Sequence, residues 1–467
     1  MEAPIFIGSV ELTEPVGGSE PPARPDGATW TQVRLLVRMQ GIPVGYAFLP
    51  PALLDAAAVA RQIWAQLGAA INARRADRGL PALFELPVSG IAPAAELVSQ
   101  LTEFPLVSVV LCTRDRPAGA MVTLRGLAAL RYDPFEIVVV DNAPSSDATE
   151  AAVRAEFGAD PRVRYVREPR PGLSVARNCG VAAAAGQIVA FTDDDVRVDP
   201  YWLDGIVRGF RQGEEVACVT GLIPTAEIDN AAQLYFDQRA TWGTGCEGRL
   251  FDLTAHRDAS PLYPYSAGIY GTGANFALAA TALKELGPFD EALGAGSPCG
   301  GGEDLEMFVR VILAGRTIAY EPSAIVSHVH RADLAQLSRQ MVAYGSGCTA
   351  ALTAIVLRHP RARLELASRL VSGVLRIFAI RDRVHGNASL PSGLMRQEFR
   401  GMLLGPWRYY RGRRALPRDS QARRALPRDS QARRALPRDS QARRGAGLPP
   451  AAGSESASYR AGRRRDS

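Results

Sequence analysis

The chain contains 467 residues, of which 47% are hydrophobic and 22% charged, enough for about three domains with large buried cores. Its net charge of +6 is uneven: the end from Gly405 onward has 17 arginines against five acidic residues, a net charge of +12, which leaves −6 for the rest. The six cysteines include no CxxC pair, so a disulfide framework or a zinc site is disfavoured and a reducing cytosol is favoured. The N-terminus lacks the features of a secretory signal. No apolar run reaches the ~18 residues of a membrane span, and the closest, residues 371–380, is interrupted by Arg376.

Residues 1–104 form a small first unit. Alternating apolar residues predict strands over 30–39 and 44–49, joined by a GIPVGY turn, and helical periodicity follows over 53–75. No cluster of catalytic residue types occurs in this segment. We therefore expect an accessory or docking α+β unit.

Strands alternate with helices between residues 105 and 333. Continuous β-branched runs of the kind buried in parallel sheets occur at 106–112, 135–140, 163–166 and 188–192. Helical segments lie between them at 117–130, 146–157 and 174–185. The pattern predicts a doubly wound, mostly parallel α/β sheet with functional residues at the carboxyl ends of its strands.

Residues 334–411 are predicted to be helical, with helices over 334–357, 362–380 and 391–404. Trp407, Tyr409 and Tyr410 lie near their end, close to several arginines. Such amphipathic helices can rest on a membrane surface, but ordinary helix packing explains the pattern better. Peripheral contact with the inner face of the membrane stays open.

Residues 412–467 contain the sequence RRALPRDSQA three times in succession. Each repeat has a proline and one large apolar residue, so it cannot build a core, and we expect a disordered arginine-rich tail. The alternative is an arginine patch that binds anionic lipid or nucleic acid. Because no aromatic residues lie between the arginines of the repeats to stack bases, no nucleic-acid partner is expected.

Carboxylates occur at three points where this architecture places functional residues. Asp141 ends the strand in VVVDN, Asp193 to Asp195 end the strand in VAFTDDDV, and Glu303 and Asp304 follow the glycines of CGGGED. A single Asp after a strand is often only a cap or a turn residue. Three adjacent carboxylates instead require a neutralising cation, and their hard oxygens select Mg²⁺ or Mn²⁺. Such a metal usually shares its ligands with a phosphate, so we expect a phosphate-bearing cosubstrate.

Two further motifs are weak signals on their own. Arg177 lies one turn into the helix that PGLSVARNCG opens, where helix amides and a guanidinium suit a diphosphate. His328 and His330 alternate in VSHVHR, so either one is a candidate metal ligand. The glycines of GTGANF, residues 271–276, do not make a dinucleotide fingerprint.

Taken together and in order, the motifs from Pro105 to about Arg331 resemble the family-2 glycosyltransferases, the inverting enzymes of the GT-A fold. The segments that carry this resemblance are VSVVLCTRDRP, VVVDN, GLSVARNCG, TDDDV, GTGANFAL, LGPFDE, GGGEDLEM and SHVHR. The resemblance implies a metal-dependent transfer of a sugar from a nucleotide-diphosphate sugar to a sugar or glycolipid acceptor, in the synthesis of cell-surface glycans or glycoconjugates. Ala279 and Ala280 stand where the family pattern has an arginine-containing pair, which puts contacts at that point in doubt.

The resemblance also implies roles for individual residues. Asp304 is the expected general base, and Asp193, Asp195 and His328 are the expected metal ligands. The nucleotide sugar is expected to contact the following residues: Thr113, Arg114, Asp115, Asp141, Arg177, Asn178, Asp193 and Asp194. The acceptor is expected beside Asn275, Gly301, Gly302 and Glu303.

Two other functions compete with this interpretation. A nucleotidyltransferase that makes sugar nucleotides would need a glycine-rich phosphate loop after the first strand of the sheet, where this chain reads CTRDRP. A catalytically inactive binding module would not need Asp193, Asp195 and Asp304, all of which are present.

Overall fold

The computed structural model describes residues 3–92, 104–240, 245–369 and 393–416. The chain divides into two compact units, Met1–Arg424 and Ala425–Ser467, and the second lies outside the described residues. Residues 417–467 of the tail predicted over 412–467 and the apolar run over 371–380 also lie outside them.

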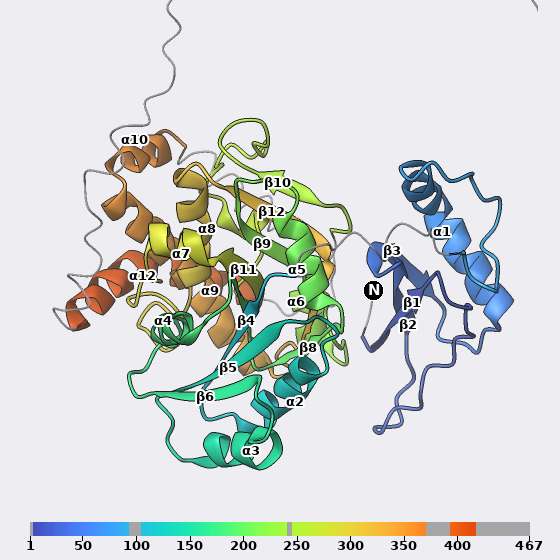
Figure 1. The fold of residues 1–467 in the computed structure, drawn as a ribbon, viewed down its shortest axis with the longest axis horizontal. Coiled ribbons are helices and arrows are strands. Elements are labelled where there is room, and N and C mark those ends of the chain that lie inside the picture. The colour runs from blue at the N-terminus through green and yellow to red at the C-terminus, as the bar shows by residue number, and fades with distance from the viewer. Residues whose placement is uncertain (1–2, 93–103, 241–244, 370–392, 417–467) are drawn as a thin grey trace, which may run out of the picture. The chain divides into compact units, whose positions relative to one another are not determined.

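The first elements form a three-stranded sheet with a core of its own (Figure 1). Strand β1 (Ile5–Glu11) pairs in parallel with β2 (Gln32–Met39), and β2 pairs antiparallel with β3 (Ile42–Leu49). Helix α1 (Ala56–Ala76), capped by the Asp55 side chain, packs against them. The predicted hairpin and helix are confirmed, while β1 was not predicted.

The larger sheet has nine strands and begins with four parallel ones. Its strands are β4 (Val107–Thr113), β5 (Phe135–Asn142), β6 (Val163–Glu168), β7 (Ile188–Thr192), β8 (Val196–Val198), β9 (Val216–Leu222), β10 (Arg249–Phe251), β11 (Asn275–Ala279) and β12 (Thr317–His328). They are ordered β10-β12-β9-β11-β7-β4-β5-β6, with β8 paired to β12. Because β11 runs antiparallel to both β7 and β9, the sheet is mixed rather than wholly parallel.

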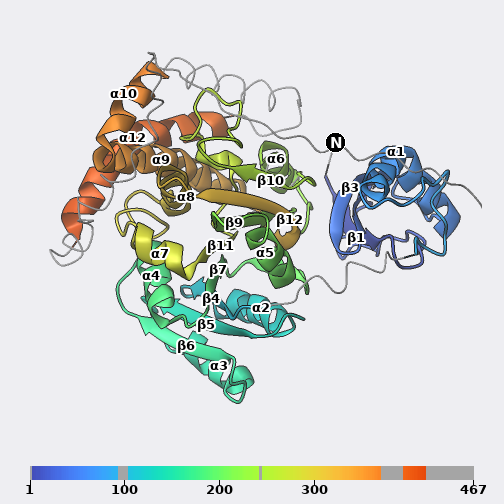
Figure 2. The same cartoon turned by 45° about the horizontal axis from the view of Figure 1, so that its top comes forward.

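Helices cover both faces of this sheet (Figures 1 and 2). One face packs against α2 (Pro117–Ala128), α3 (Ala148–Phe157) and α5 (Trp202–Phe210), and the other against α4 (Leu173–Ala183), α7 (Ala280–Leu286) and α8 (Glu303–Leu313). Val109 and Leu111 of β4 pack in the core on the side of α2, α3 and α5. Val110 and Cys112 pack in the core on the side of α4, α7 and α8. Both faces are therefore apolar, which is why this strand reads as an uninterrupted hydrophobic run. All six cysteines are free, and Cys112, Cys218 and Cys299 are buried.

The remaining helices are α6 (Ala231–Arg239), α9 (Leu334–Arg358), α10 (Pro360–Ser368) and α12 (Leu394–Ala415). Helix α12 runs past the predicted end of the helical region at residue 411, because Gly412 packs closely on Ala292 and continues the buried face. In the described part of the chain, α9 is the one helix long and apolar enough to cross a membrane, and 44% of its apolar window is buried. The core helix of a folded domain passes the same test. Interspersed serine, threonine and glycine hide α9 from a search for unbroken apolar runs.

Candidate functional site

Two carboxylates and an imidazole converge at one end of the larger sheet. Asp193 and Asp195 directly follow β7, and His328 ends β12. One ligand atom from each of the three lies within 4.8 Å of the others, and His328 Nε2 is 3.3 Å from Asp195 Oδ1. The Nδ1 atom of His328 is buried and has no hydrogen-bond partner in the described chain. This donor set fits a divalent cation.

The neighbouring His330 is turned away from this cluster. Its ring stacks on that of His328 with the centroids 5.0 Å apart and is tilted by 44° against the ring of Phe236, whose centroid is 4.3 Å away; its Nε2 lies 3.1 Å from the Thr225 hydroxyl. Burial lowers the pKa of His330 to about 3, so the ring is neutral at ordinary pH. Of the two candidate histidines, the geometry therefore selects His328.

The middle carboxylate, Asp194, does not belong to this group of three ligand residues. It accepts hydrogen bonds from Thr113 Oγ1 at 2.7 Å and from Arg116 Nη1 at 2.5 Å. Burial raises its pKa to about 6 even though both donors favour the charged form. Thr113 and Asp194 thus join the ends of β4 and β7, and their contact with a nucleotide stays a prediction.

A second group of predicted residues lies at the carboxyl ends of β4 and β5. Thr113 and Asp141 are partners in the register of these two strands. Asp141 is buried, accepts a hydrogen bond from the Tyr165 hydroxyl at 2.8 Å, and has an elevated pKa because of its burial. Asp115 has a φ of +53° and accepts hydrogen bonds from Ser145 N and Oγ at 2.7 and 2.8 Å, which lower its pKa. Arg114 is exposed 3.9 Å from Asp115.

The buried side chain of Arg177 lies between Asp193 and Glu303 and contacts both. Its guanidinium donates to Glu303 Oε1 at 2.8 Å and to the Gly273 carbonyl at 3.0 Å, and it lies 3.6 Å from Asp193 Oδ1. The rings of Phe191, Phe276 and Phe289 enclose it at 5.3 to 5.9 Å. Because the side chain is only 2% exposed, a contact with a diphosphate would require it to leave this pocket.

Glu303 and Asp304 begin α8 but have different surroundings. Glu303 is buried, and its burial together with the charge of Asp304 raises its pKa to about 7 in spite of Arg177. Asp304 is partly exposed; its Oδ2 accepts the Gly273 N–H at 2.6 Å and its Oδ1 accepts the Leu305 N–H at 2.8 Å. Of the two, Asp304 is the carboxylate that an incoming hydroxyl can reach.

The predicted residues Asn178 and Asn275 make hydrogen bonds within the fold around the site. Asn178 exchanges two hydrogen bonds with the backbone of Phe289. Asn275 has no exposed surface, because its amide bonds Trp202 and the carbonyls of Leu222 and Ala324. The structure therefore does not place the Asn275 side chain where an acceptor could touch it.

The two glycines form the close backbone contact that holds the start of α8. Gly301 bridges to Gly294, and a Cβ on Gly302, whose φ is +92°, would lie 2.2 Å from the Gly347 carbonyl oxygen. Only glycine fits at residue 302.

Comparisons with known proteins agree with this arrangement. The family model described as Glycosyl transferase family 2 matches residues 108–257. The succinoglycan biosynthesis protein ExoM of Rhizobium meliloti is 32% identical over 245 residues, which are 50% of this chain and 71% of that protein. The chain belongs to glycosyl transferase family 2. Its α/β sheet with helices on both faces is a GT-A fold.

Another relative and a solved structure are also similar to this chain. The pre-mycofactocin glycosyltransferase of Mycobacterium tuberculosis is 28% identical over 257 residues, which are 54% of this chain and 48% of that protein. The chain therefore spans about half the length of that relative. Among solved structures, the mannosyltransferase PcManGT from Pyrobaculum calidifontis in complex with GDP-Man and Mn²⁺ is 17% identical, with a TM-score of 0.45 over 66% of this chain and 88% of that one.

Some residues at this site were not predicted. Arg116 reaches both Asp194 and Asp195, the latter at 3.1 Å, and Arg331 lies 3.6 Å from Asp195. Tyr165 holds Asp141 from the neighbouring strand β6. Arg116 and Arg331 lie within the motifs CTRDRP and SHVHR, but nothing in the sequence shows that the two arginines converge on one carboxylate.

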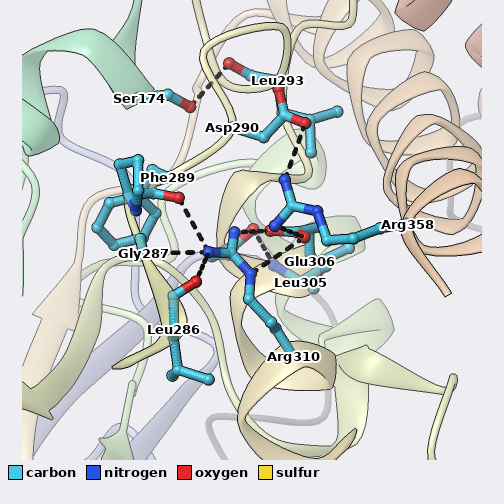
Figure 3. Close-up of polar contacts among 12 residues, drawn as sticks. Ser174, Leu286, Gly287, Phe289, Asp290, Leu293, Leu305, Glu306, Arg310 and Arg358 are labelled. Atoms are coloured by element: carbon cyan, nitrogen blue, oxygen red, sulfur yellow. Dashed lines mark hydrogen bonds and ion pairs between the residues drawn. The ribbon is translucent and has the colours of Figure 1, made fainter. Parts of the chain in front are cut away.

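A buried ionic cluster anchors α8 one turn beyond its carboxylates (Figure 3). Glu306 pairs with Arg310 of the same helix and with Arg358 of α9, the latter at 3.0 Å. Arg358 also lies 3.5 Å from Asp290, which accepts a hydrogen bond from the Tyr409 hydroxyl of α12 at 2.8 Å. Arg310 further donates to the carbonyls of residues 286 to 288. These contacts join the C-terminal helices α9 and α12 to α8, the helix that begins at Glu303.

Proposed function

We propose that this glycosyltransferase moves a sugar from a nucleoside diphosphate sugar to an acceptor hydroxyl, with inversion at the anomeric carbon and with a divalent metal ion. The observation that carries the proposal is the cluster of Asp193, Asp195 and His328, whose ligand atoms lie within 4.8 Å of one another. Arg177 connects Asp193 of that cluster to Glu303, so a metal site and a pair of carboxylates belong to one continuous network.

Asp193, Asp195 and His328 are the residues that would hold Mn²⁺ or Mg²⁺. When bound, such an ion stabilises the negative charge that the departing diphosphate acquires. On the donor side, we propose that Asp141 accepts a hydrogen bond from the nucleotide base and that Arg114 and Asp115 lie beside it. Thr113 and Asp194 hydrogen-bond each other beside Arg114, and Asn178 holds the backbone of Phe289.

Asp304 is the proposed general base. Its partial exposure lets it take the proton from the acceptor hydroxyl while that oxygen bonds to the anomeric carbon. A single base opposite the leaving group gives direct displacement and therefore inversion, whereas a glycosidase needs two carboxylates that flank the bond. The loop that ends in Gly301 and Gly302 would face a sugar or glycolipid acceptor. We place the reaction in glycan synthesis at the cytoplasmic side of the membrane.

The test is release of nucleoside diphosphate from a panel of nucleotide sugars, with and without Mn²⁺ or Mg²⁺. We expect metal-dependent release by the wild-type protein and its loss in Asp195→Asn, because one of three metal ligands becomes a neutral amide. Asp147→Asn is the matched control, since Asp147 is an exposed carboxylate paired with Arg167. Full activity in Asp195→Asn, or equal activity without metal, would contradict the proposal.

A further inference from the structure

Helix α12 presents an apolar face to solvent. Leu403 is 79% exposed, Trp407 58% and Tyr410 52%, and the spacing of four and three residues places them on one side of the helix. The opposite side, with Gly401, Gly405 and Tyr409, is buried against the rest of the domain. The fold therefore does not need the three exposed side chains for packing.

The exposed face of α12 is also strongly basic. Arg396, Arg400, Arg411 and Arg414 are exposed on it, and in the described chain none of the four pairs with a carboxylate. The one acidic residue of helix α12, Glu398, is buried and paired with Arg239 of α6. Two of the arginines lie over the aromatic rings: Arg411 is 5.5 Å from the centroid of Trp407, and Arg414 is 4.4 Å from that of Tyr410.

A hollow of about 370 Å³ continues this basic surface toward α9. It is lined by Arg339, Arg400 and Arg408 together with Val342 and Ala343. Ala343 is also the nearest neighbour of Gly300, in the loop that leads to Glu303. The hollow is therefore basic on its sides and close to the loop proposed to face the acceptor.

We propose that the exposed face of α12 docks on an anionic phospholipid bilayer. Trp407 and Tyr410 suit the headgroup level, Leu403 enters the acyl boundary, and the arginines reach lipid phosphates while their stems stay on the apolar surface. Charge complementarity selects this occupant, because a face with four free arginines and no exposed acid attracts an anionic surface at about fivefold in affinity per arginine. A nucleic acid would leave the highly exposed Leu403 without an apolar environment. Docking in this way brings the acceptor loop to the membrane, where a lipid-linked acceptor lies.

The test is co-sedimentation of the full-length chain with phosphatidylcholine vesicles that contain about one third phosphatidylglycerol or none. We expect binding to the anionic vesicles alone, weakened by salt. Leu403→Glu should reduce it by at least ~10-fold, because it removes apolar insertion and adds a repelled charge. Arg400→Gln and Arg414→Gln should each reduce it about fivefold. Because all variants retain the arginine-rich tail, binding through the tail would leave these differences absent.

Leu53→Glu, in the N-terminal unit, is the matched control, since Leu53 is 75% exposed. It should bind as the wild type does, and the melting temperature of each variant shows that it is folded. Unchanged binding by Leu403→Glu, an equal loss in Leu53→Glu, or equal binding to neutral vesicles would overturn the proposal. The proposal would also be overturned if Arg400→Gln and Arg414→Gln lost binding to a single-stranded oligonucleotide while their binding to vesicles was unchanged. The measurement needs no sugar transfer, so it stands or falls separately from the enzymatic activity.

Discussion

Glu303 and Asp304 are adjacent in sequence, yet only Asp304 is accessible to an acceptor. We expect Asp304→Asn to lower turnover by ~10²–10⁴-fold, the contribution of a positioned general base, and to leave donor binding within a few-fold. Donor affinity is measured by calorimetry with Mn²⁺ and turnover by release of nucleoside diphosphate. Asp193→Asn should instead weaken metal-dependent donor binding as well as turnover.

Glu303→Gln provides the comparison for that experiment. It preserves the shape of the side chain and its acceptor oxygen toward Arg177, so it should cost less activity than Asp304→Asn. If Glu303→Gln proves the more damaging change, or if Asp304→Asn loses donor binding as severely as Asp195→Asn does, the base has been assigned to the wrong residue.

The elevated pKa of Asp141 predicts a pH dependence of donor binding. An ionised carboxylate accepts a hydrogen bond from a base more strongly than a protonated one does, so donor affinity should fall as the pH drops through this raised pKa. The Tyr165 hydroxyl stabilises the ionised form, and Tyr165→Phe should therefore move the fall to higher pH. The measurement is the Kd of the nucleotide sugar against pH for both proteins. An unchanged profile in Tyr165→Phe would remove Asp141 from the donor site.

At this scale, the sequence was sufficient where function depends on residue type at a strand end. Asp193 and Asp195 could be predicted as candidate ligands because adjacent carboxylates after an apolar strand need a neutralising cation, whereas the sequence left the choice between His328 and His330 open. The surroundings of Arg177 and Asn275 could not be predicted. Their burial depends on Phe276, Trp202 and other partners remote in the chain, so only tertiary structure shows that both are held inside the fold.

Among the elements, the parallel strands were the easiest to predict. Strands β4, β5 and β7 are buried on both faces and read as unbroken apolar runs. Strand β12 was harder, because Pro322 interrupts its pattern and its register with β9 shifts between Glu321 and Ile325. Strand β1 was not predicted, and its pairing with β2 spans the connection over residues 12–31.

The ionic cluster around Glu306 should stabilise the contact between α8 and the C-terminal helices. Arg358→Met leaves Glu306 with Arg310 as its partner and removes the ion pair of Arg358 with Asp290, so we expect a loss of ~3–5 kcal/mol in the free energy of unfolding, measured in urea. Arg363→Met, which removes an exposed arginine from α10, is the control. A loss equal to that of the control would mean that the cluster contributes no stability.

The same cluster gives a direction for acid sensitivity. Its arginines hold the pKa of Glu306 below the usual carboxyl range. The stability that Glu306 contributes is therefore present above the unfolded-state pKa of about 4.3 and is lost as the pH falls through the lower folded-state value. Glu306→Gln should flatten that part of the curve of unfolding free energy against pH.

For the molecule as a whole, we predict that the chain beyond α12 contributes little to stability. A chain ending at Leu416 should melt within ~2 °C of the full-length protein, because the repeats beyond it lack the apolar residues to pack. A chain ending at Arg408 should melt several degrees lower, since it loses the Tyr409 hydrogen bond to Asp290 and the contact of Gly412 with Ala292. Calorimetry of the three chains measures the difference. Equal melting of the two truncated chains would contradict this limit.

The buried free cysteines allow local opening of the native protein to be measured by chemical labelling. Burial raises the pKa of Cys112, at the end of β4, and of Cys299, in the loop before α8, to about 12 each. At neutral pH their thiols react with an alkylating reagent only when the surrounding segment opens. Mass spectrometry of the labelled peptides would then time two motions in the unmodified enzyme: the opening of the sheet at Cys112 and the opening of the acceptor loop at Cys299. A donor or acceptor that closes this loop would slow the second rate alone.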